Sequence, residues 1–454
     1  MISTTGLHID QAPPLHIPFR FFVTAPLFLA AAGVGVLLWG SDLWISPLAP
    51  QSVALAHLIV LGWVSMTMFG AMYQMIPVLA ALPMPWLRLA PWVHGGLTLG
   101  VAAFALEVGV GVHRWLLLVA SAGLGIAVGL FLLQTGRALV KTRVKHPTVN
   151  AMRVATLSLS GVLVLGAIFL GEYAHGFLSV DRQMILGIHL TWGLLGWVGV
   201  LIIGVSMQVL PMFYVMPMFP VRAGRIVLAG FGVTLILLPL ALWFLSANPV
   251  WSWLAALPAA IAGVVYTVAM TRLFAARKRK IRDATYRFWQ AGLGCGAVGL
   301  LIPALWPVLD AERWRFLFAV LYLWGGVSSI ILGMLYKIVP FLVWFHRFSR
   351  LAGLVEAIPM MDDLIPERLS RIHFALHVAT IPLLAGGIFF DGPWLIRLGG
   401  VGMILSGGLL LHAIRTATRH QAPPMPEMPD FDSFFKDFKP PTANSPATTP
   451  IPEG

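Results

Sequence analysis

Residues 57–79 of the sequence read HLIVLGWVSMTMFGAMYQMIPVL, and residues 189–213 read HLTWGLLGWVGVLIIGVSMQVLPMF. Each stretch opens with a histidine, continues as an apolar run and ends close to a proline. A helix of about 20 residues crosses a hydrocarbon core ~30 Å thick, so each run predicts a membrane-spanning helix. The likeness of the two stretches indicates that the chain contains an internal repeat.

The composition of the whole chain agrees with a membrane protein. Of its 454 residues, 58% are hydrophobic and 11% are charged, and the mean hydropathy is +0.86. A water-soluble protein of this size has too little interior to hide so much apolar surface. The sequence therefore predicts an all-α polytopic membrane protein. The net charge of +12 comes from Lys and Arg beside apolar segments, where such residues set topology and contact anionic lipid.

Twelve apolar windows predict twelve membrane-spanning helices. The windows lie at 18–40, 52–80, 87–111, 114–136, 150–174, 183–213, 224–246, 249–272, 286–309, 314–345, 369–391 and 393–414. Lys and Arg gather in every second loop, so the positive-inside rule predicts that both chain ends are cytoplasmic. We expect a cytoplasmic segment at 1–17, a twelve-helix domain at 18–415 and a disordered, Pro-rich cytoplasmic tail at 416–454.

The twelve spans are predicted to form three pseudo-repeats of four helices, at about 18–146, 147–282 and 283–415. Spans 2, 6 and 10 align on a proline, with two glycines and one polar residue at the same distances before it. The aligned residues are Pro77, Pro211 and Pro340; Gly70, Gly204 and Gly333; Gly62, Gly196 and Gly325; and Gln74, Gln208 and Lys337. This organisation differs from the inverted halves of many transporters.

His57 and His189 are the first candidates for a cofactor site. Both lie a few residues inside sister helices, which a threefold arrangement of the repeats places around one centre. An ionisable side chain inside a membrane is costly and by default marks a functional site. Neutral imidazole is a common ligand of haem iron and copper, so we expect the pair to bind such a cofactor. The alternative is that each imidazole forms a hydrogen bond with a neighbouring helix or with water.

A second group of histidines is predicted near the opposite end of the spans: His94, His373 and His377. His373 and His377 are four residues apart and share one helix face, which is suited to two ligands of one metal ion. The alternative is that these imidazoles interact with helix ends and lipid headgroups. The single cysteine, Cys295, excludes an internal disulfide and a cysteine-rich metal site.

These motifs resemble a known family. The pattern H-x(3)-LGW-x(6)-G-x(3)-Q-x(2)-P at 57–77, with its echo in span 6, is similar to subunit I of the haem-copper oxidases and their nitric-oxide-reductase relatives. The opening PFRFFVTAPLF at 18–28 resembles the NnrS-type membrane proteins, which are linked to nitric oxide and contain haem and copper. The resemblance implies an oxidase-like fold in a bacterial inner membrane. It also implies haem and/or copper as cofactors, with His57 matching a haem ligand and His189 a copper ligand.

The chain departs from the ligand set that the resemblance implies. A working oxidase has further histidines in or near span 7 and in span 10, whereas here 224–246 contains none and span 10 has only His346, beyond its far end. We therefore do not expect a complete terminal oxidase or nitric-oxide reductase. The expected function is haem or copper binding in respiratory or nitric-oxide-related physiology.

Two other functions are compatible with the sequence. One is a permease without a redox cofactor, in which Gln74, Gln208 and Lys337 line a polar path at matching depth. The other is an assembly factor for a respiratory complex whose ancestral ligands have been lost. The expected partners are membrane lipid and respiratory or electron-transfer proteins, with no nucleic acid.

Overall fold

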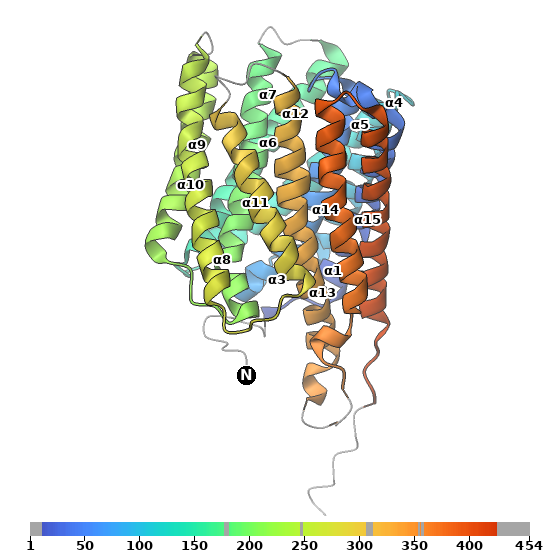
Figure 1. Ribbon diagram of the computed structural model, residues 1–454, viewed down its shortest axis with the longest axis vertical. Helices are drawn as coiled ribbons and strands as arrows, with labels where there is room; N and C mark the ends of the chain where they lie inside the picture. The colour runs from blue at the N-terminus through green and yellow to red at the C-terminus, as the bar shows by residue number, and fades with distance from the viewer. Residues whose placement is uncertain are drawn as a thin grey trace, which may run out of the picture.

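The computed structural model describes residues 11–176, 181–245, 248–305, 312–352, 355 and 358–424. Within these residues the protein is all-helical and has no β-strand (Figure 1). Eleven of the described helical stretches are long and apolar enough to cross a membrane, and α11 (Ala284–Ala304) adds a stretch of 21 residues. The predicted all-α class is confirmed, and the helices suit a polytopic membrane protein.

Most of the long helices are uninterrupted α-helices. They are α1 (His16–Trp39), α4 (Ala90–Val110), α5 (Leu116–Lys141), α6 (Pro147–His175), α9 (Val221–Phe244), α10 (Pro249–Ala276), α11, α14 (Glu367–Phe389) and α15 (Pro393–Arg419). Short 3₁₀ turns lie between them: η2 (Gly40–Trp44), η4 (Leu87–Leu89), η8 (Ser349–Leu351) and η9 (Met361–Asp363). The predicted windows match the long helices to within a few residues at most ends.

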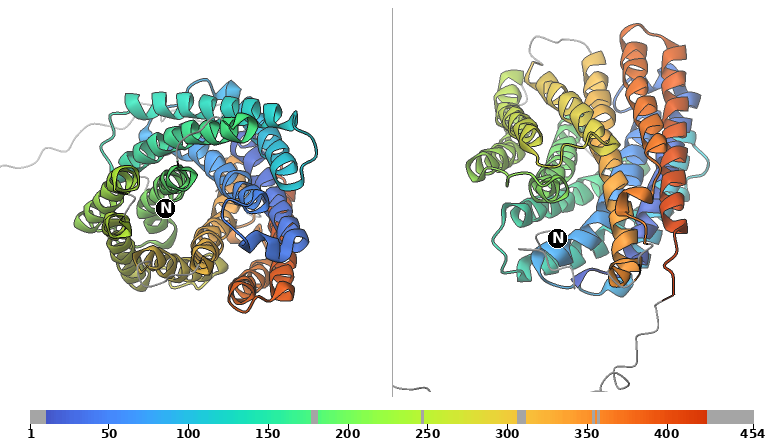
Figure 2. Two further views of the ribbon diagram at one scale, coloured as in Figure 1. Left: turned by 90° about the horizontal axis from the view of Figure 1, so that it is seen from above. Right: turned by 60° about the horizontal axis from the view of Figure 1, so that its bottom comes forward.

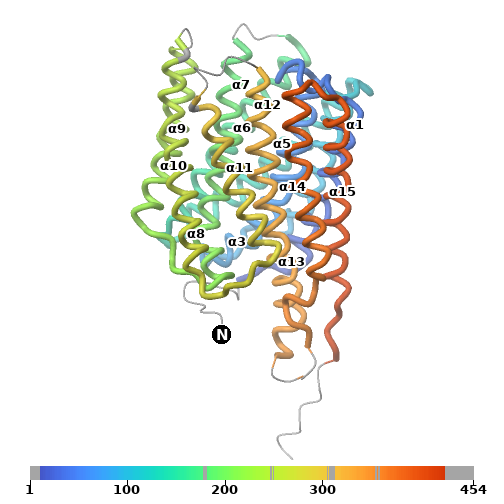
Figure 3. Tube along the Cα trace, in the orientation of Figure 1, coloured from blue at the N-terminus to red at the C-terminus, as the bar shows by residue number. Residues whose placement is uncertain are grey.

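Three further long helices are composite, because each contains a π-helical segment between two α-helical parts. They are α2 (Pro50–His57), η3 (Leu58–Ser65) and α3 (Met66–Ala80); α7 (Arg182–Leu190), η5 (Thr191–Gly199) and α8 (Val200–Tyr214); and α12 (Arg313–Ala319), η7 (Val320–Ser328) and α13 (Ser329–Arg347). Each is one continuous path in Figure 3. π-helical segments are rare, and those that do occur are often found at functional sites.

The C-terminal helix is longer than the sequence windows predict. The tail was predicted to begin at residue 416, but α15 continues to Arg419. Its last turn is held by Arg347 at the end of α13, which donates hydrogen bonds to the carbonyl oxygens of Thr418 and His420. Those carbonyls have no partner within their own helix, so the arginine extends it. Residues 1–10 and 425–454, in the predicted terminal segments, lie outside the described residues.

The three π-helical segments are joined to one another by buried hydrogen bonds. The bonds form a closed ring: Trp63 Nε1 to Ser328 Oγ (3.0 Å), Trp197 Nε1 to Ser65 Oγ (2.9 Å) and Tyr322 OH to the carbonyl oxygen of Leu194 (2.8 Å). A buried indole N–H or phenol O–H that lacks a partner is costly, so each bond specifies which side chains face each other. The three composite helices are thereby locked around one axis.

Glycines let each composite helix pack closely against the helix that precedes it. A Cβ atom on any of six glycines would come within 3.0 Å of a side-chain atom of that neighbour. The pairs are Gly62 with Phe28, Gly70 with Phe21, Gly196 with Ser158, Gly204 with Ala151, Gly325 with Cys295, and Gly333 with Phe288. The partner helices are α1, α6 and α11, and on each the two contact residues have the same spacing. Small residues of this kind are what allow membrane helices to approach one another.

The first and last helices close the bundle. α1 and α15 lie side by side, as the blue and red ends of the chain show in Figure 2. A Cβ on Gly400 would lie 2.7 Å from the backbone nitrogen of Leu37, and one on Gly407 would lie 2.5 Å from the carbonyl oxygen of Pro26. The outward faces of the surrounding helices carry exposed apolar side chains such as Leu118 and Leu157, a surface suited to lipid.

Candidate functional site

His57 and His189 lie beside each other in the folded chain. His57 is the last residue of α2 and immediately precedes the π-helical segment η3. His189 is the next-to-last residue of α7, and one residue separates it from η5. Their ring centres are 6.4 Å apart, and the ring planes are inclined by 31°. Two histidines separated by more than 130 positions in the sequence therefore lie side by side in the fold.

The hydrogen bonds of the two rings leave nitrogen atoms for a ligand. His57 Nδ1 donates to the carbonyl oxygen of Val53 at 2.7 Å, which leaves Nε2 of the neutral ring with its lone pair. His189 Nδ1 is buried and has no hydrogen-bond partner among the described residues. Phe104 packs against His57 at 4.5 Å and Phe169 meets His189 edge-on at 5.8 Å. Neighbouring residues thus orient both rings, and each ring keeps a nitrogen atom that can bind a ligand.

The spacing of the rings fits ligation of one metal atom. The ring centres are 6.4 Å apart, and two metal–nitrogen bonds of ~2.0–2.1 Å would allow both imidazoles to reach one metal atom. If copper or haem iron were bound here, His57 and His189 would supply nitrogen ligands to it.

His373 and His377 share a face of α14, as their spacing predicts, but their contacts do not suit a metal site. His373 Nδ1 lies 2.8 Å from the hydroxyl of Tyr336, and its Nε2 lies 2.6 Å from Ser406 Oγ. Both nitrogens of this ring are therefore engaged. His377 Nε2 lies 2.7 Å from Ser329 Oγ, and its Nδ1 has no partner in the described part of the chain.

His94 is engaged separately from the other two members of the predicted second site. Its Nε2 lies 2.8 Å from Thr24 Oγ1 of α1. Across the described ranges, no group of three or more His, Cys, Asp or Glu side chains is arranged to hold a metal ion. The predicted cluster of His94, His373 and His377 is therefore not assembled, because each imidazole turns toward a hydroxyl group on a neighbouring helix.

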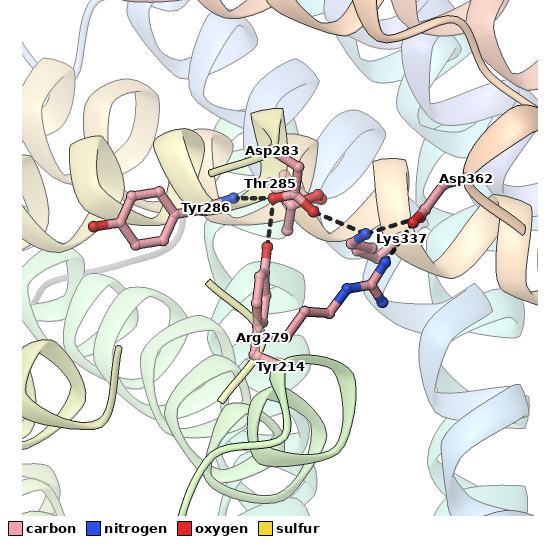
Figure 4. Close-up of polar contacts among 8 residues, drawn as sticks. Tyr214, Arg279, Asp283, Thr285, Tyr286, Lys337 and Asp362 are labelled. Atoms are coloured by element: carbon pink, nitrogen blue, oxygen red, sulfur yellow. Dashed lines mark hydrogen bonds and ion pairs between the residues drawn. The ribbon is translucent and has the colours of Figure 1, made fainter. Parts of the chain in front are cut away.

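Lys337, one of the three predicted polar-path residues, lies in a cluster of four charged side chains (Figure 4). Its side chain is 7% exposed, and its Nζ lies 2.8 Å from Asp283 Oδ2 and 3.2 Å from Asp362 Oδ1. Arg279, in the loop between α10 and α11, forms an ion pair with the same Asp362. Two cations and two carboxylates meet here, so the charge of the buried lysine is compensated.

Asp283 connects this cluster to the start of α11. One of its oxygens accepts hydrogen bonds from the backbone N–H of Tyr286 (2.9 Å) and from the hydroxyl of Tyr214 (2.7 Å). The residue therefore caps α11 while its second oxygen binds Lys337. A carboxylate at a helix N-terminus is also favoured by the helix dipole.

The other two polar-path candidates make different contacts. Gln74 is buried, and its Oε1 has no hydrogen-bond partner among the described residues. Gln208, at the aligned position of the second repeat, is only half-buried. Lys337 is directed to carboxylates of the loop before α11 and of η9 rather than along its own helix. Gln74, Gln208 and Lys337, which the sequence alignment places at equivalent positions, therefore lie in three different environments.

Stability in acid is expected to depend on Asp362. Partial burial alone would raise the pKa of this carboxyl, but Lys337 and Arg279 hold it below the ordinary value of 3.8. The ionised form therefore stabilises the fold above about pH 4, and this contribution is lost as the pH falls through the lowered pKa. The loss stays below about 1 kcal/mol because the side chain is half-exposed. Unfolding measured from pH 6 to pH 3 should show Asp362→Asn converging with the wild type in acid; a constant difference would contradict this.

The two aspartates were not among the residues singled out from the sequence, although a signal for them exists. A lysine in an apolar span needs a counter-charge, and the chain has only 18 acidic residues in all. Asp283 is the first residue of the third predicted repeat, and Asp362 lies in the loop after span 10. Only the folded chain shows that both belong to Lys337.

Comparisons with known proteins do not assign a family to this chain. No protein-family model matches it, and no curated protein matches it significantly in sequence.

Proposed function

We propose that this protein binds copper or haem iron in a membrane through His57 and His189. The observation that carries the proposal is the approach of the two rings to 6.4 Å, together with the buried, unpartnered Nδ1 of His189. This separation would allow both imidazoles to bind one metal atom. The aromatic rings of Phe104 and Phe169 pack directly on the imidazoles, which favours a single copper ion over a flat macrocycle.

We also propose that the chain is related to subunit I of the haem-copper oxidases and to NnrS-type proteins, as three pseudo-repeats of four helices. Support comes from the three π-helical segments, each followed at the same spacing by Pro77, Pro211 or Pro340. Further support comes from the matching glycine contacts of the three composite helices with α1, α6 and α11. A repeat predicts that equivalent positions make equivalent contacts.

The proposed setting is a bacterial inner membrane, with respiratory or nitric-oxide-related physiology. The positive-inside rule assigns the basic loop at 277–282 and both chain ends to the cytoplasm. His346 Nε2, at the end of α13, lies 3.2 Å from the carbonyl oxygen of Pro13, and Arg347 binds the last turn of α15, so the two ends meet at one end of the bundle. The histidine pair then lies toward the opposite, outer side. The residues present do not form a complete oxidase site.

The permease alternative has less support. It requires Lys337 to carry charge or protons along a polar path, but the lysine is held by Asp283 and Asp362. Breaking a buried, compensated pair is costly. No contact of Gln74 or Gln208 points to transport.

Metal analysis of the purified full-length protein tests the proposal. After reconstitution with Cu(I) or haem, the wild type should bind about one metal atom per chain. His57→Ala and His189→Ala should each weaken binding by more than about 100-fold, because a lost ligand costs more than the 10–100-fold typical of losing a group that only hydrogen-bonds to a ligand. The metal content and the optical spectrum of the same sample report which metal is bound.

The matched control is His412→Ala, which removes an exposed histidine of α15. It should leave the metal content unchanged. The proposal is wrong if the His57→Ala/His189→Ala double variant keeps the wild-type metal content. It is equally wrong if the wild type binds neither copper nor haem.

A further inference from the structure

An open cleft lies beside the start of α11, away from the histidine pair. Its volume is about 400 Å³, and its lining residues are Arg282, Tyr286, Arg287, Gln290, Ala291 and Phe374. Five of these belong to the loop before α11 or to its first two turns, and Phe374 comes from α14. Figure 4 shows the ring of Tyr286 turned away from the Lys337 cluster. The cleft is therefore a separate feature.

The charges around this cleft are all positive and uncompensated. Arg282 and Arg287 are exposed, and neither has an ion-pair partner among the described residues. The nearest acid in the sequence, Asp283, is occupied by Lys337, by Tyr214 and by a backbone N–H group. An exposed arginine at the end of a membrane-spanning helix extends to the headgroup region, where it can contact anionic lipid.

A third guanidinium group raises the positive potential behind the cleft. Arg277 is buried and lies over the ring of Tyr286, with its Cζ 4.3 Å from the ring centre. Its Nε has no hydrogen-bond partner in the described part of the chain. Tyr286 is thus in contact with a buried cation and is also one of the residues that line the cleft.

We propose that this cleft binds the headgroup of one anionic phospholipid. The guanidinium groups of Arg282 and Arg287 match the paired oxygens of a phosphodiester, to which arginine donates two parallel hydrogen bonds. Gln290 and Tyr286 provide further donors for the glycerol part, while Ala291 and Phe374 offer apolar contact to the beginning of an acyl chain. Basic pockets between membrane helices, close to the headgroup region, are suited to such lipids.

Lipid competition on the full-length protein tests this site. The probe is phosphatidylglycerol added to protein in phosphatidylcholine nanodiscs, with retained lipid counted by native mass spectrometry after release into detergent. The wild type should retain one phosphatidylglycerol with about tenfold preference over phosphatidylcholine. Arg282→Gln/Arg287→Gln should lose that preference, whereas Arg287→Lys should keep part of it because the charge remains.

The matched control is Arg222→Gln/Arg225→Gln, which removes two exposed arginines from the first turns of α9. Retention unchanged in the control and lost in the cleft variant supports the proposal. Retention that survives in the cleft variant, or falls equally in both, overturns it. A separate titration compares inorganic phosphate without lipid to phosphatidylglycerol. If phosphate raises the unfolding temperature as much as phosphatidylglycerol does at the same concentration, the site binds a free anion and the lipid assignment is overturned.

Discussion

Gly407→Leu is expected to unfold the protein under conditions in which the wild type is stable. A Cβ at this position of α15 would lie 2.5 Å from the carbonyl oxygen of Pro26 and 3.0 Å from the backbone nitrogen of Ala30, both on α1. Backbone atoms of a packed helix cannot move aside as the tip of a side chain can, so the two helices must separate. We expect a loss of about 3 kcal/mol or more, at or above the upper end of overpacking penalties.

The adjacent glycine provides the control. Around Gly408, no described atom outside its own helix lies within 4 Å of an added Cβ. Gly408→Leu should therefore leave stability unchanged or raise it slightly, because leucine favours a helix by up to about 1 kcal/mol over glycine. Thermal unfolding of both variants in the same detergent is the measurement. Equal unfolding temperatures for the two variants would refute the close approach of α1 and α15.

Asp283→Asn is expected to destabilise the protein by about 3 kcal/mol, near the lower end of the range for breaking a buried ion pair. The substitution leaves the ammonium group of Lys337, 7% exposed, with only the half-exposed Asp362 as a carboxylate partner. Asp362→Asn should cost about 1 kcal/mol, because the Lys337–Asp283 pair remains and exposed pairs contribute little. Chemical denaturation with a common baseline measures both values.

A double-mutant cycle separates the ion pair from simple loss of packing. Lys337→Met removes the cation that Asp283→Asn leaves unpaired, so the combined variant should regain most of the lost stability. If the two effects simply add, Lys337 and Asp283 are not coupled, and the charge cluster does not hold α13 to the start of α11. A second cycle, with Asp362→Asn and Lys337→Met, serves as the comparison. We expect a smaller coupling energy between these two residues than between Lys337 and Asp283.

The positions of the helices follow directly from the sequence because membrane-spanning helices need long apolar runs. The two exceptions have particular causes. α15 extends to Arg419 because Arg347 supplies partners for its last carbonyls, a contact between distant residues. The π-helical form of 58–65, 191–199 and 320–328 does not follow from the sequence pattern, because hydrophobicity alone does not distinguish a π-helix from an α-helix.

For the candidate site, matching depth in two apolar spans predicts which histidines lie close together. His57 and His189 meet because α2 and α7 lead into π-helical segments that are bonded to each other through Trp197 and Ser65. His94 and His373 lie in the first two turns of α4 and α14, and His377 lies at the middle of α14, but side-chain rotation decides their partners. Each turns to a hydroxyl group of Thr24, Ser406 or Ser329 among others, and hydroxyl groups carry no recognisable pattern in a sequence.

The pairing of α1 with α15 has a consequence for biogenesis. Membrane helices enter the bilayer in chain order during translation, and among the described residues α15 is the last long helix to be made. Until it arrives, the glycine face of α1 that Gly400 and Gly407 later cover is exposed to lipid or to an insertion factor. The contact between the first and last of these helices can therefore form only after residues 393–419 have been made, and until then α1 packs against η3 and α3 but has this second face uncovered.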